Sequence, residues 1–268
     1  MDNKSEFDAD KASFFRIHEL RVDKNLINEF RKELGLSEIE LDFGVEHLKT
    51  IHAYIFQDAV SIPAIQTWAG SEPDITPGRF REATVGWAKH RTVNNFEYYI
   101  FYAPREVVDA ELEQTLAIGV QSLHRAGDNP EIFARKMTQF YGRLDYLHPF
   151  EDGNSRALRT YTEQIARSAG YDLDWSIAMS DTEAMKALYI ARDKEVAEYM
   201  FTTVSEETKK EIKEELGKNK DLFIERLQQG EFDGDETSIA LIILYGVYGN
   251  ATSLYDIIKN SLRPLEMP

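Results

Sequence analysis

Hydrophobic residues recur along most of this chain at spacings of three and four, the pattern of amphipathic helices. The first predicted helix covers residues 11–34. The second covers residues 45–56 and carries Leu48, Ile51 and Ile55 on one side. Further along, the same pattern predicts helices over residues 108–126, 130–147, 154–169, 180–199, 206–229 and 237–262. The chain is therefore expected to fold as a mainly α protein.

Residues 61–104 break the helical pattern and are rich in proline and glycine. Two short β-prone runs, 83–87 and 98–102, flank a polar segment that contains Asn94 and Asn95. Two such runs around a polar turn predict a β-hairpin.

Capping residues mark where two of the helices begin. Asn129 is a suitable N-cap, with Pro130 at the first helical position. Ser180-x-x-Glu183 matches a capping box. The helix that follows Asn129 has a wide apolar face and is predicted to be the core helix, with Ile132, Phe133, Met137, Phe140, Tyr141, Leu144 and Leu147.

Composition narrows the class of protein. Hydrophobic residues make up 43% of the 268 residues and charged residues 29%, as in an ordinary globular protein. The net charge of −16 argues against a nucleic-acid-binding surface. Cysteine is absent, which excludes disulfides and thiolate chemistry. Neither an apolar run of ~20 residues nor a basic, apolar leader is visible, so we expect a cytoplasmic location.

The chemistry is concentrated between two predicted helices, where residues 148–159 are His-Pro-Phe-Glu-Asp-Gly-Asn-Ser-Arg-Ala-Leu-Arg. Pro149 ends the first helix, so His148 lies where the helix becomes a loop. Gly153 and Asn154 tolerate unusual backbone angles and precede the second helix. The N-terminus of that helix is a ready anion site.

Two arginines and a carboxylate complete this segment. Arg156 and Arg159 are three residues apart on the first turn, so both can face one anion. Because cations are unfavourable at a helix N-terminus, we expect a polyphosphate to compensate them. Asp152 suits Mg²⁺, which binds through one or two carboxylates plus phosphate oxygens. A base, a metal ligand and an anion site are what phosphoryl or nucleotidyl transfer requires.

The segment resembles the signature of the Fic family (filamentation induced by cAMP), H-x-F-x-[D/E]-G-N-x-R-x-x-R, at every specified position. Similarity also surrounds it, in Ile51-His52 and Phe56-Gln57, in Trp68-Ala69-Gly70, and in Phe101-Tyr102-Ala103-Pro104. The resemblance covers roughly residues 45–200. It implies a helical bundle with a β-hairpin flap over the active site, an N-terminal helical extension (1–44) and a C-terminal one (201–268).

The resemblance also implies roles. His148 would be the general base that takes the proton of a Ser, Thr or Tyr hydroxyl on a target protein, and Phe150 would anchor the loop. Asp152 would bind Mg²⁺. The phosphates of ATP would be held by the following residues, namely Gly153, Asn154, Ser155, Arg156 and Arg159. The flap, about residues 79–103, would pair with an extended segment of the target.

Two features depart from the commonest family pattern. Many Fic proteins have a second glycine where this chain has Ser155, and the branch that phosphorylates its target has a lysine there. Serine keeps the backbone N–H, so phosphate binding is expected to survive. Because the lysine is absent, transfer of AMP is preferred over phosphorylation. The stretch from Arg79 to Tyr99 differs from the shorter flap of many relatives.

Among the other histidines no zinc-ligand spacing is seen, and His52 is interpreted as a packed helix residue.

Regulation is expected to come from a second protein. Many Fic proteins are silenced by a helix with [S/T]-x-x-x-E-[G/N], whose glutamate pairs with the second motif arginine, here Arg159. Thr202 and Thr203 each have a glutamate four residues on, but the next residue does not match. This predicts a bacterial Fic toxin held inactive by a small antitoxin. The alternatives are a secreted effector that modifies host GTPases, and a catalytically weak Fic-fold binding module.

Overall fold

A computed structural model of the chain describes residues 43–57, 76–82, 87–93, 96–202, 204–207, 209–214 and 236–265, with four single positions between 218 and 229. The predicted helix over residues 11–34 and the Trp68-Ala69-Gly70 segment lie outside the described residues.

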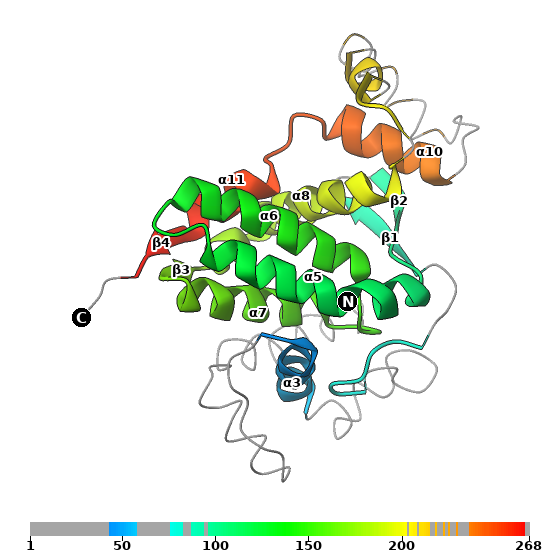
Figure 1. Cartoon of the computed structure of the whole chain (residues 1–268). Coiled ribbons are helices and arrows are strands. Elements are labelled where there is room, and N and C mark those ends of the chain that lie inside the picture. The colour runs from blue at the N-terminus through cyan, green and yellow to red at the C-terminus, as the bar shows by residue number, and fades with distance from the viewer. Residues whose placement is uncertain are drawn as a thin grey trace, which may run out of the picture.

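The fold is a helical bundle built around one central helix (Figure 1). The bundle helices are α5 (Arg105–His124), α6 (Pro130–Leu147), α7 (Asn154–Ser168) and α8 (Thr182–Met200). Helix α6 packs against the other three, and α3 (Val45–Phe56) packs against α7. Helix α6 begins as predicted, because the Asn129 side chain accepts from the N–H groups of Glu131 and Ile132. The mainly α fold predicted from the sequence is confirmed.

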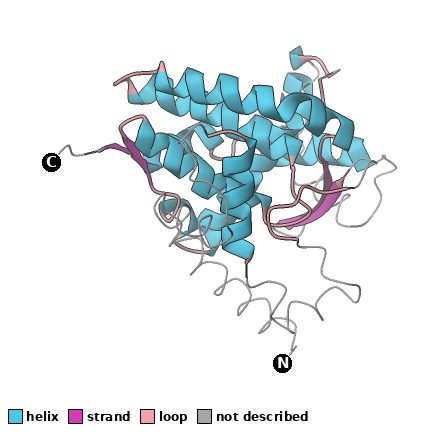
Figure 2. Cartoon of the chain, turned by 60° about the horizontal axis from the view of Figure 1, so that its bottom comes forward, coloured by secondary structure: helices cyan, strands magenta, loops and turns pink. Residues whose placement is uncertain are grey.

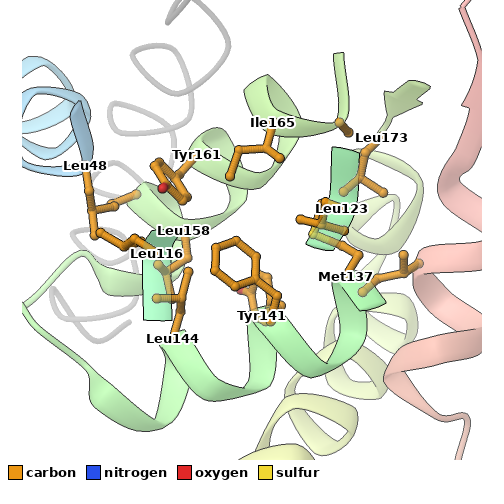
Figure 3. Packing of buried hydrophobic residues seen from close by; sticks show 14 of the residues in the cluster. Leu48, Leu116, Leu123, Met137, Tyr141, Leu144, Leu158, Tyr161, Ile165 and Leu173 are labelled. Atoms are coloured by element: carbon orange, nitrogen blue, oxygen red, sulfur yellow. The ribbon is translucent and has the colours of Figure 1, made fainter. Parts of the chain in front are cut away.

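The main core lies between these helices, where side chains from α3, α5, α6 and α7 meet (Figure 3). Its centre includes Leu48, Leu116, Met137, Tyr141, Leu144, Leu158, Tyr161 and Ile165. Ile132, which the apolar pattern placed on this face, is instead 45% exposed on the first turn of α6. The core supports the segment that joins α6 to α7.

Two small antiparallel sheets lie at opposite ends of the bundle (Figure 2). One is the hairpin of β1 (Ala88–Val93) and β2 (Phe96–Phe101), with Lys89 opposite Ile100. The other pairs β3 (Tyr171–Leu173) with β4 (Leu262–Pro264). The remaining elements are η2 (Ile177–Met179), α10 (Glu236–Leu241), the π-helical η3 (Ile242–Val247) and α11 (Leu254–Ser261). None of the helices described has the length and apolar content that a bilayer span requires.

The hairpin belongs to a hydrophobic cluster of its own, separate from the main core. Its inner face packs on the C-terminal half of α8, on α10 and on η3, through Val93, Phe96, Tyr98, Ile100, Ile190, Val196, Phe201, Ala240, Ile243 and Leu244. The Tyr248 hydroxyl donates to the Val93 carbonyl at 2.8 Å. The C-terminal segment therefore holds the hairpin against α8.

The hairpin forms, and its first strand consists of residues that the sequence pattern did not assign to a strand. Strand β1 is Ala88–Val93 and is mostly polar, whereas residues 83–86 of the predicted run lie outside the described residues. The alternation of apolar and polar residues fails there because Lys89 and Arg91 are partly buried on the inner face, where Arg91 pairs with Asp193. Strand β2 lies within two residues of the predicted run.

Two other helix boundaries also differ from the prediction. The N-cap of α8 is Asp181, whose carboxylate accepts from the Ala184 N–H, so Ser180 is not the cap. The segment 237–262 is not one helix. It is interrupted after η3 and restarts at α11, where the Ser253 hydroxyl caps the Asp256 N–H.

Candidate active site

The predicted site residues lie where α6 ends and α7 begins. His148 is the C-cap of α6 and has a left-handed backbone (φ 46°), and its N–H donates to the Leu144 carbonyl. Arg81 is fully buried and donates from its guanidinium to the carbonyls of His148 (2.7 Å), Leu147 and Ala103. This buried cation binds the carbonyls exposed at the helix end and fixes the chain direction at His148.

The loop after His148 is closed by its own side chains. Asn154 accepts from the Phe150 N–H at 2.9 Å and donates to the Phe150 carbonyl at 2.7 Å. The Phe150 ring is fully buried and stacks on His52, with ring centroids 3.9 Å apart. His52 bonds the Asp152 carbonyl through Nε2 and accepts from the Gly78 N–H through Nδ1. His52 is thus a packed helix residue, as predicted, and it also holds the loop.

Helix α7 starts as the sequence predicts. Gly153 is its N-cap with φ +78°, a left-handed conformation that favours glycine. Its carbonyl accepts from the N–H groups of Arg156 and Ala157. The N–H groups of Asn154 and Ser155, the first two helical residues, have no intrahelical acceptor. The loop therefore ends in a helix N-terminus of the kind that binds anions.

Replacing Gly153 with alanine is expected to damage this loop. A Cβ there would overlap the Phe56 ring and approach His52 Nε2 at 3.2 Å, and the positive φ adds backbone strain. We expect a loss of about 1–3 kcal/mol in the free energy of unfolding and much weaker ATP binding. Urea denaturation and nucleotide titration measure the two effects.

Gly170→Ala is the matched control. Gly170 also has a positive φ (+88°), but a Cβ there meets no described atom within 4 Å. Gly170→Ala should lower the free energy of unfolding through backbone strain alone, and it should leave ATP binding unchanged. Equal ATP affinity in Gly153→Ala and the wild type would contradict the role given to this turn.

The His148 ring is buried between the loop and the hairpin. It stacks on Tyr102, with ring centroids 3.7 Å apart. Its Nδ1 lies 3.3 Å from the Asp145 carbonyl oxygen and 3.8 Å from Asp145 Oδ1. Its Nε2 has no hydrogen-bond partner among the described residues. The ring therefore has one nitrogen facing acceptors and one nitrogen available to act as a base.

Burial, and then the positive charge of Lys89, lower the pKa of His148 to about 3. Lys89 comes from the inner face of β1, and burial lowers its own pKa as well. A histidine with a low pKa is neutral at pH 7, which is the form that accepts a proton.

The low pKa predicts how stability depends on pH. Unfolding returns His148 to its ordinary pKa near 6.5, so the unfolded chain binds a proton that the folded chain does not. The contribution of the neutral His148 ring to the free energy of unfolding is complete above pH 6.5. It is lost as the pH falls towards 3, at about 1.4 kcal/mol per pH unit. Urea denaturation from pH 7.5 to 4.5 should show a shallower decline for His148→Asn. Parallel curves would contradict the assignment.

Asp145 and Arg192 form a fully buried ion pair next to His148. Arg192 Nε lies 3.0 Å from Oδ2, and Nη2 lies 2.8 Å from Oδ1. Burial alone would raise the pKa of Asp145, but the charge of Arg192 and the bond with His148 hold it below its ordinary value. Asp145 is therefore an anion at neutral pH.

The predicted phosphate-binding arginines both have protein contacts. Arg159 is buried and donates from Nη1 to Ser155 Oγ at 2.6 Å. Arg156 is half-buried, with its guanidinium 5.8 Å from the centre of the Phe56 ring. Both arginines thus lie on the first turns of α7, beside the helix N-terminus.

A second buried ion pair joins the hairpin to α8. Arg91, on β1, contacts both carboxylate oxygens of Asp193 at 3.1–3.3 Å. Tyr98 donates to the same carboxylate at 2.9 Å, and Arg91 also donates to the Tyr102 hydroxyl. Since Tyr102 stacks on His148, this pair links the hairpin to the candidate base.

The residues present fit the magnesium ion that the motif implies. Asp152 is half-buried in the loop, and its Oδ1 accepts from the Gly153 N–H at 2.7 Å. No cluster of three or more His, Cys, Asp or Glu suited to a metal is present in the described part of the chain. A single carboxylate beside a helix N-terminus is compatible with Mg²⁺, which usually binds through one or two carboxylates while phosphates and water supply its other ligands.

The structure brings all the predicted site residues together, on the loop and the first two turns of α7. It adds residues that the sequence did not single out, each from another element. These are Arg81 before the hairpin, Lys89 and Arg91 on β1, Asp145 on α6, and Arg192 and Asp193 on α8. In the sequence, the only indication of these residues is a charged side chain on a face of its element that is otherwise buried.

The chain is similar to known proteins over the stretch that contains this loop. Residues 41–166 match the Fic/DOC family. Protein adenylyltransferase VbhT of Bartonella schoenbuchensis is 29% identical over 143 residues, which are 53% of this chain and 25% of that protein. The probable protein adenylyltransferase Fic of Salmonella typhimurium is 29% identical over 161 residues, which are 54% of this chain and 68% of that protein. The chain thus spans a quarter of one relative and about two thirds of the other.

A solved structure supports the fold. The N-terminal Fic domain of a putative cell filamentation protein from Bartonella quintana, solved with bound ADP, superposes with a TM-score of 0.50 at 15% identity. The match covers 99% of this chain and 89% of that one. The helical bundle with its hairpin is therefore a Fic fold.

Proposed function

We propose that this chain is a protein adenylyltransferase of the Fic/DOC family, the family that residues 41–166 match. It transfers AMP from ATP to a Ser, Thr or Tyr hydroxyl of another protein. The observation that carries the proposal is the buried, unprotonated His148, whose Nε2 lacks a partner among the described residues and whose loop leads into the N-terminus of α7.

The residues act as follows. His148 Nε2 takes the proton of the target hydroxyl as its oxygen attacks the α-phosphorus of ATP. A bond forms between that oxygen and phosphorus, the bond to the bridging oxygen breaks, and pyrophosphate leaves. The N–H groups of Asn154 and Ser155, with Gly153 leaving room for a close approach, bind the α-phosphate oxygens.

The leaving pyrophosphate needs positive charge. Arg156 and Arg159 supply it from the first turns of α7, after Arg159 exchanges its bond with Ser155 for phosphate oxygens. Asp152 would hold Mg²⁺ on the phosphates, and the ion would neutralise charge on them. A serine at position 155 keeps its main-chain N–H, so nucleotidyl transfer is compatible with this site.

The target docks on the hairpin. In a two-stranded sheet each strand has an outer edge, and an extended segment of another protein can add to such an edge by main-chain hydrogen bonds. The flap of residues 79–103 would in this way bring a hydroxyl to His148 with little dependence on target sequence.

The setting proposed is a bacterial toxin acting in the cytoplasm of its own cell and held inactive by a separate small antitoxin. The support is the absence from the sequence of the inhibitory motif that would pair with Arg159. The roles of residues 1–44 and 201–268 as extensions of a Fic core over 45–200 are part of this proposal.

The test is label transfer. The protein, Mg²⁺ and a bacterial lysate are incubated in parallel with α-labelled and γ-labelled ATP, and His148→Ala serves as the control. Protein labelled from the α position only, and not by His148→Ala, is the expected result. Label from the γ position would indicate a kinase. No transfer from α-labelled ATP, UTP, GTP or CTP would indicate a binding module.

A further inference from the structure

The Asp145–Arg192 pair has no place in the Fic signature, yet it contacts both halves of the site. It is fully buried, and Arg192 binds Asp145 through two nitrogens, Nε and Nη2. Burying two charges is costly and often stabilises a fold less than apolar packing would. Such a pair therefore calls for a role in addition to stability.

On one side, Asp145 faces the base. Its carbonyl oxygen is 3.3 Å from His148 Nδ1, and its carboxylate Oδ1 is 3.8 Å from the same nitrogen. Two oxygens near Nδ1 favour the tautomer that carries the proton there, which leaves the lone pair on Nε2. A fixed negative charge at this distance also stabilises the imidazolium that forms once Nε2 has taken a proton.

On the other side, Arg192 reaches the phosphate-binding helix. Its third nitrogen, Nη1, donates to Ser155 Oγ at 2.7 Å, and Arg159 Nη1 donates to the same oxygen at 2.6 Å. The Ser155 hydroxyl is therefore shared by two guanidinium groups. One continuous set of contacts runs from the base through Asp145 and Arg192 to the second motif arginine.

We propose that Asp145 and Arg192 are positioning residues for the transfer reaction: Asp145 holds His148 with its proton on Nδ1, and Arg192 fixes Asp145 and places Ser155 and Arg159. The proposal rests on the proposed function. It assigns to α8, outside the signature, the alignment of the base with the phosphate site.

The chain offers a matched control on the same helix. Asp193 is also buried and also binds an arginine, Arg91, through both carboxylate oxygens. Its partners lie on the hairpin: among the described residues its carboxylate bonds Arg91 and Tyr98, and not His148 or Ser155. Asp193→Asn thus removes a buried charge of the same kind that makes no direct contact with the base and reaches it only through Arg91 and Tyr102.

Two measurements test the proposal. The first is the initial rate of labelling by α-labelled ATP in Asp145→Asn and Arg192→Lys, with ATP binding measured in parallel. We expect a rate about 10–100-fold lower and a dissociation constant for ATP changed by about twofold or less in Asp145→Asn. Arg192→Lys should lower the rate and also weaken ATP binding, because the Ser155 contact is lost.

The second measurement is ¹⁵N NMR of the histidine rings, with the His148 signals identified by their absence in His148→Ala. The wild type should show Nδ1 protonated and Nε2 bare. Asp145→Asn should lose this preference, whereas Asp193→Asn should keep it. A fold-stabilising role alone would leave the tautomer unchanged in every folded variant.

Several outcomes would overturn the proposal. They are a wild-type labelling rate in Asp145→Asn, the proton on Nε2 in the wild type, or an equal change of tautomer in Asp193→Asn. If the wild-type protein transfers no label, the result contradicts the proposed function instead. In that case the tautomer shift in Asp145→Asn still decides whether the pair positions His148.

Discussion

Replacing His148 with alanine is expected to lower the rate of AMP transfer by about 10²–10⁴-fold, the range attributed to a single general base. The reason is that Nε2 is the ring nitrogen without a partner among the described residues, and burial keeps the ring neutral. Binding of ATP should change little, because the phosphates are assigned to the loop amides and to α7. The loss should therefore appear in kcat and not in the affinity for nucleotide.

The measurement is the initial rate of labelling by α-labelled ATP, together with ATP titration of both proteins. His148→Asn is a useful second variant, since asparagine tolerates the left-handed backbone found at this position. His124→Ala, at an exposed site at the end of α5, is the matched control and should transfer at the wild-type rate. If His148→Asn kept more than half of the wild-type rate, another group would have to take the proton.

Arg192→Met is expected to have the largest effect on stability, a loss of about 3–5 kcal/mol in the free energy of unfolding at pH 7.5. It leaves Asp145 as a buried carboxylate whose bidentate partner is gone. The double change Asp145→Leu with Arg192→Met should recover most of the loss, because no charge then remains to be buried.

The loss in Arg192→Met should also shrink as the pH falls. In the wild type, Arg192 keeps the pKa of Asp145 below its ordinary value, so this carboxylate stabilises the fold above about pH 4 and that contribution fades at lower pH. Without Arg192, burial raises the pKa of Asp145 and the folded state favours the protonated form. The difference in the free energy of unfolding between the wild type and Arg192→Met should therefore be smaller at pH 4.5 than at pH 7.5.

Urea denaturation at the two pH values measures this difference. Arg167→Met removes an arginine from ion pairs with Glu163 and Asp172 in which its side chain is 53% exposed, and it should leave stability nearly unchanged. A pH-independent loss in Arg192→Met would show that the cost comes from lost packing and not from the charge of Asp145.

The sequence predicted the parts of this fold that depend on neighbours along the chain. Asn129 and Pro130 start α6, and Gly153 opens α7, because capping and backbone preference are local properties. Ser180 was wrong as a cap because two adjacent residues could both fill that position, and Asp181 does. Local chemistry predicts a helix start to within a residue or two.

The parts that could not be predicted depend on distant partners. Lys89 and Arg91 made β1 look like a polar turn, and the carboxylate that allows Arg91 to be buried, Asp193, is 102 residues away. Asp145 and Arg192 are separated by 47 residues, and no periodicity relates them. Buried ion pairs between elements leave no pattern within either element, so the candidate base was predicted and its supports were not.

The packing of the hairpin on α10 and η3 has a consequence for how such a protein can diversify. The strands are supported by α8 and by residues 236–248, both beyond the stretch that matches the family. Changes in those helices are expected to alter the orientation of the hairpin, where we propose that the target docks, while the loop between α6 and α7 keeps its shape. A graft of residues 41–166 alone would carry the hairpin and the loop between α6 and α7, but it would lack both the helices that hold the hairpin and Arg192 on α8.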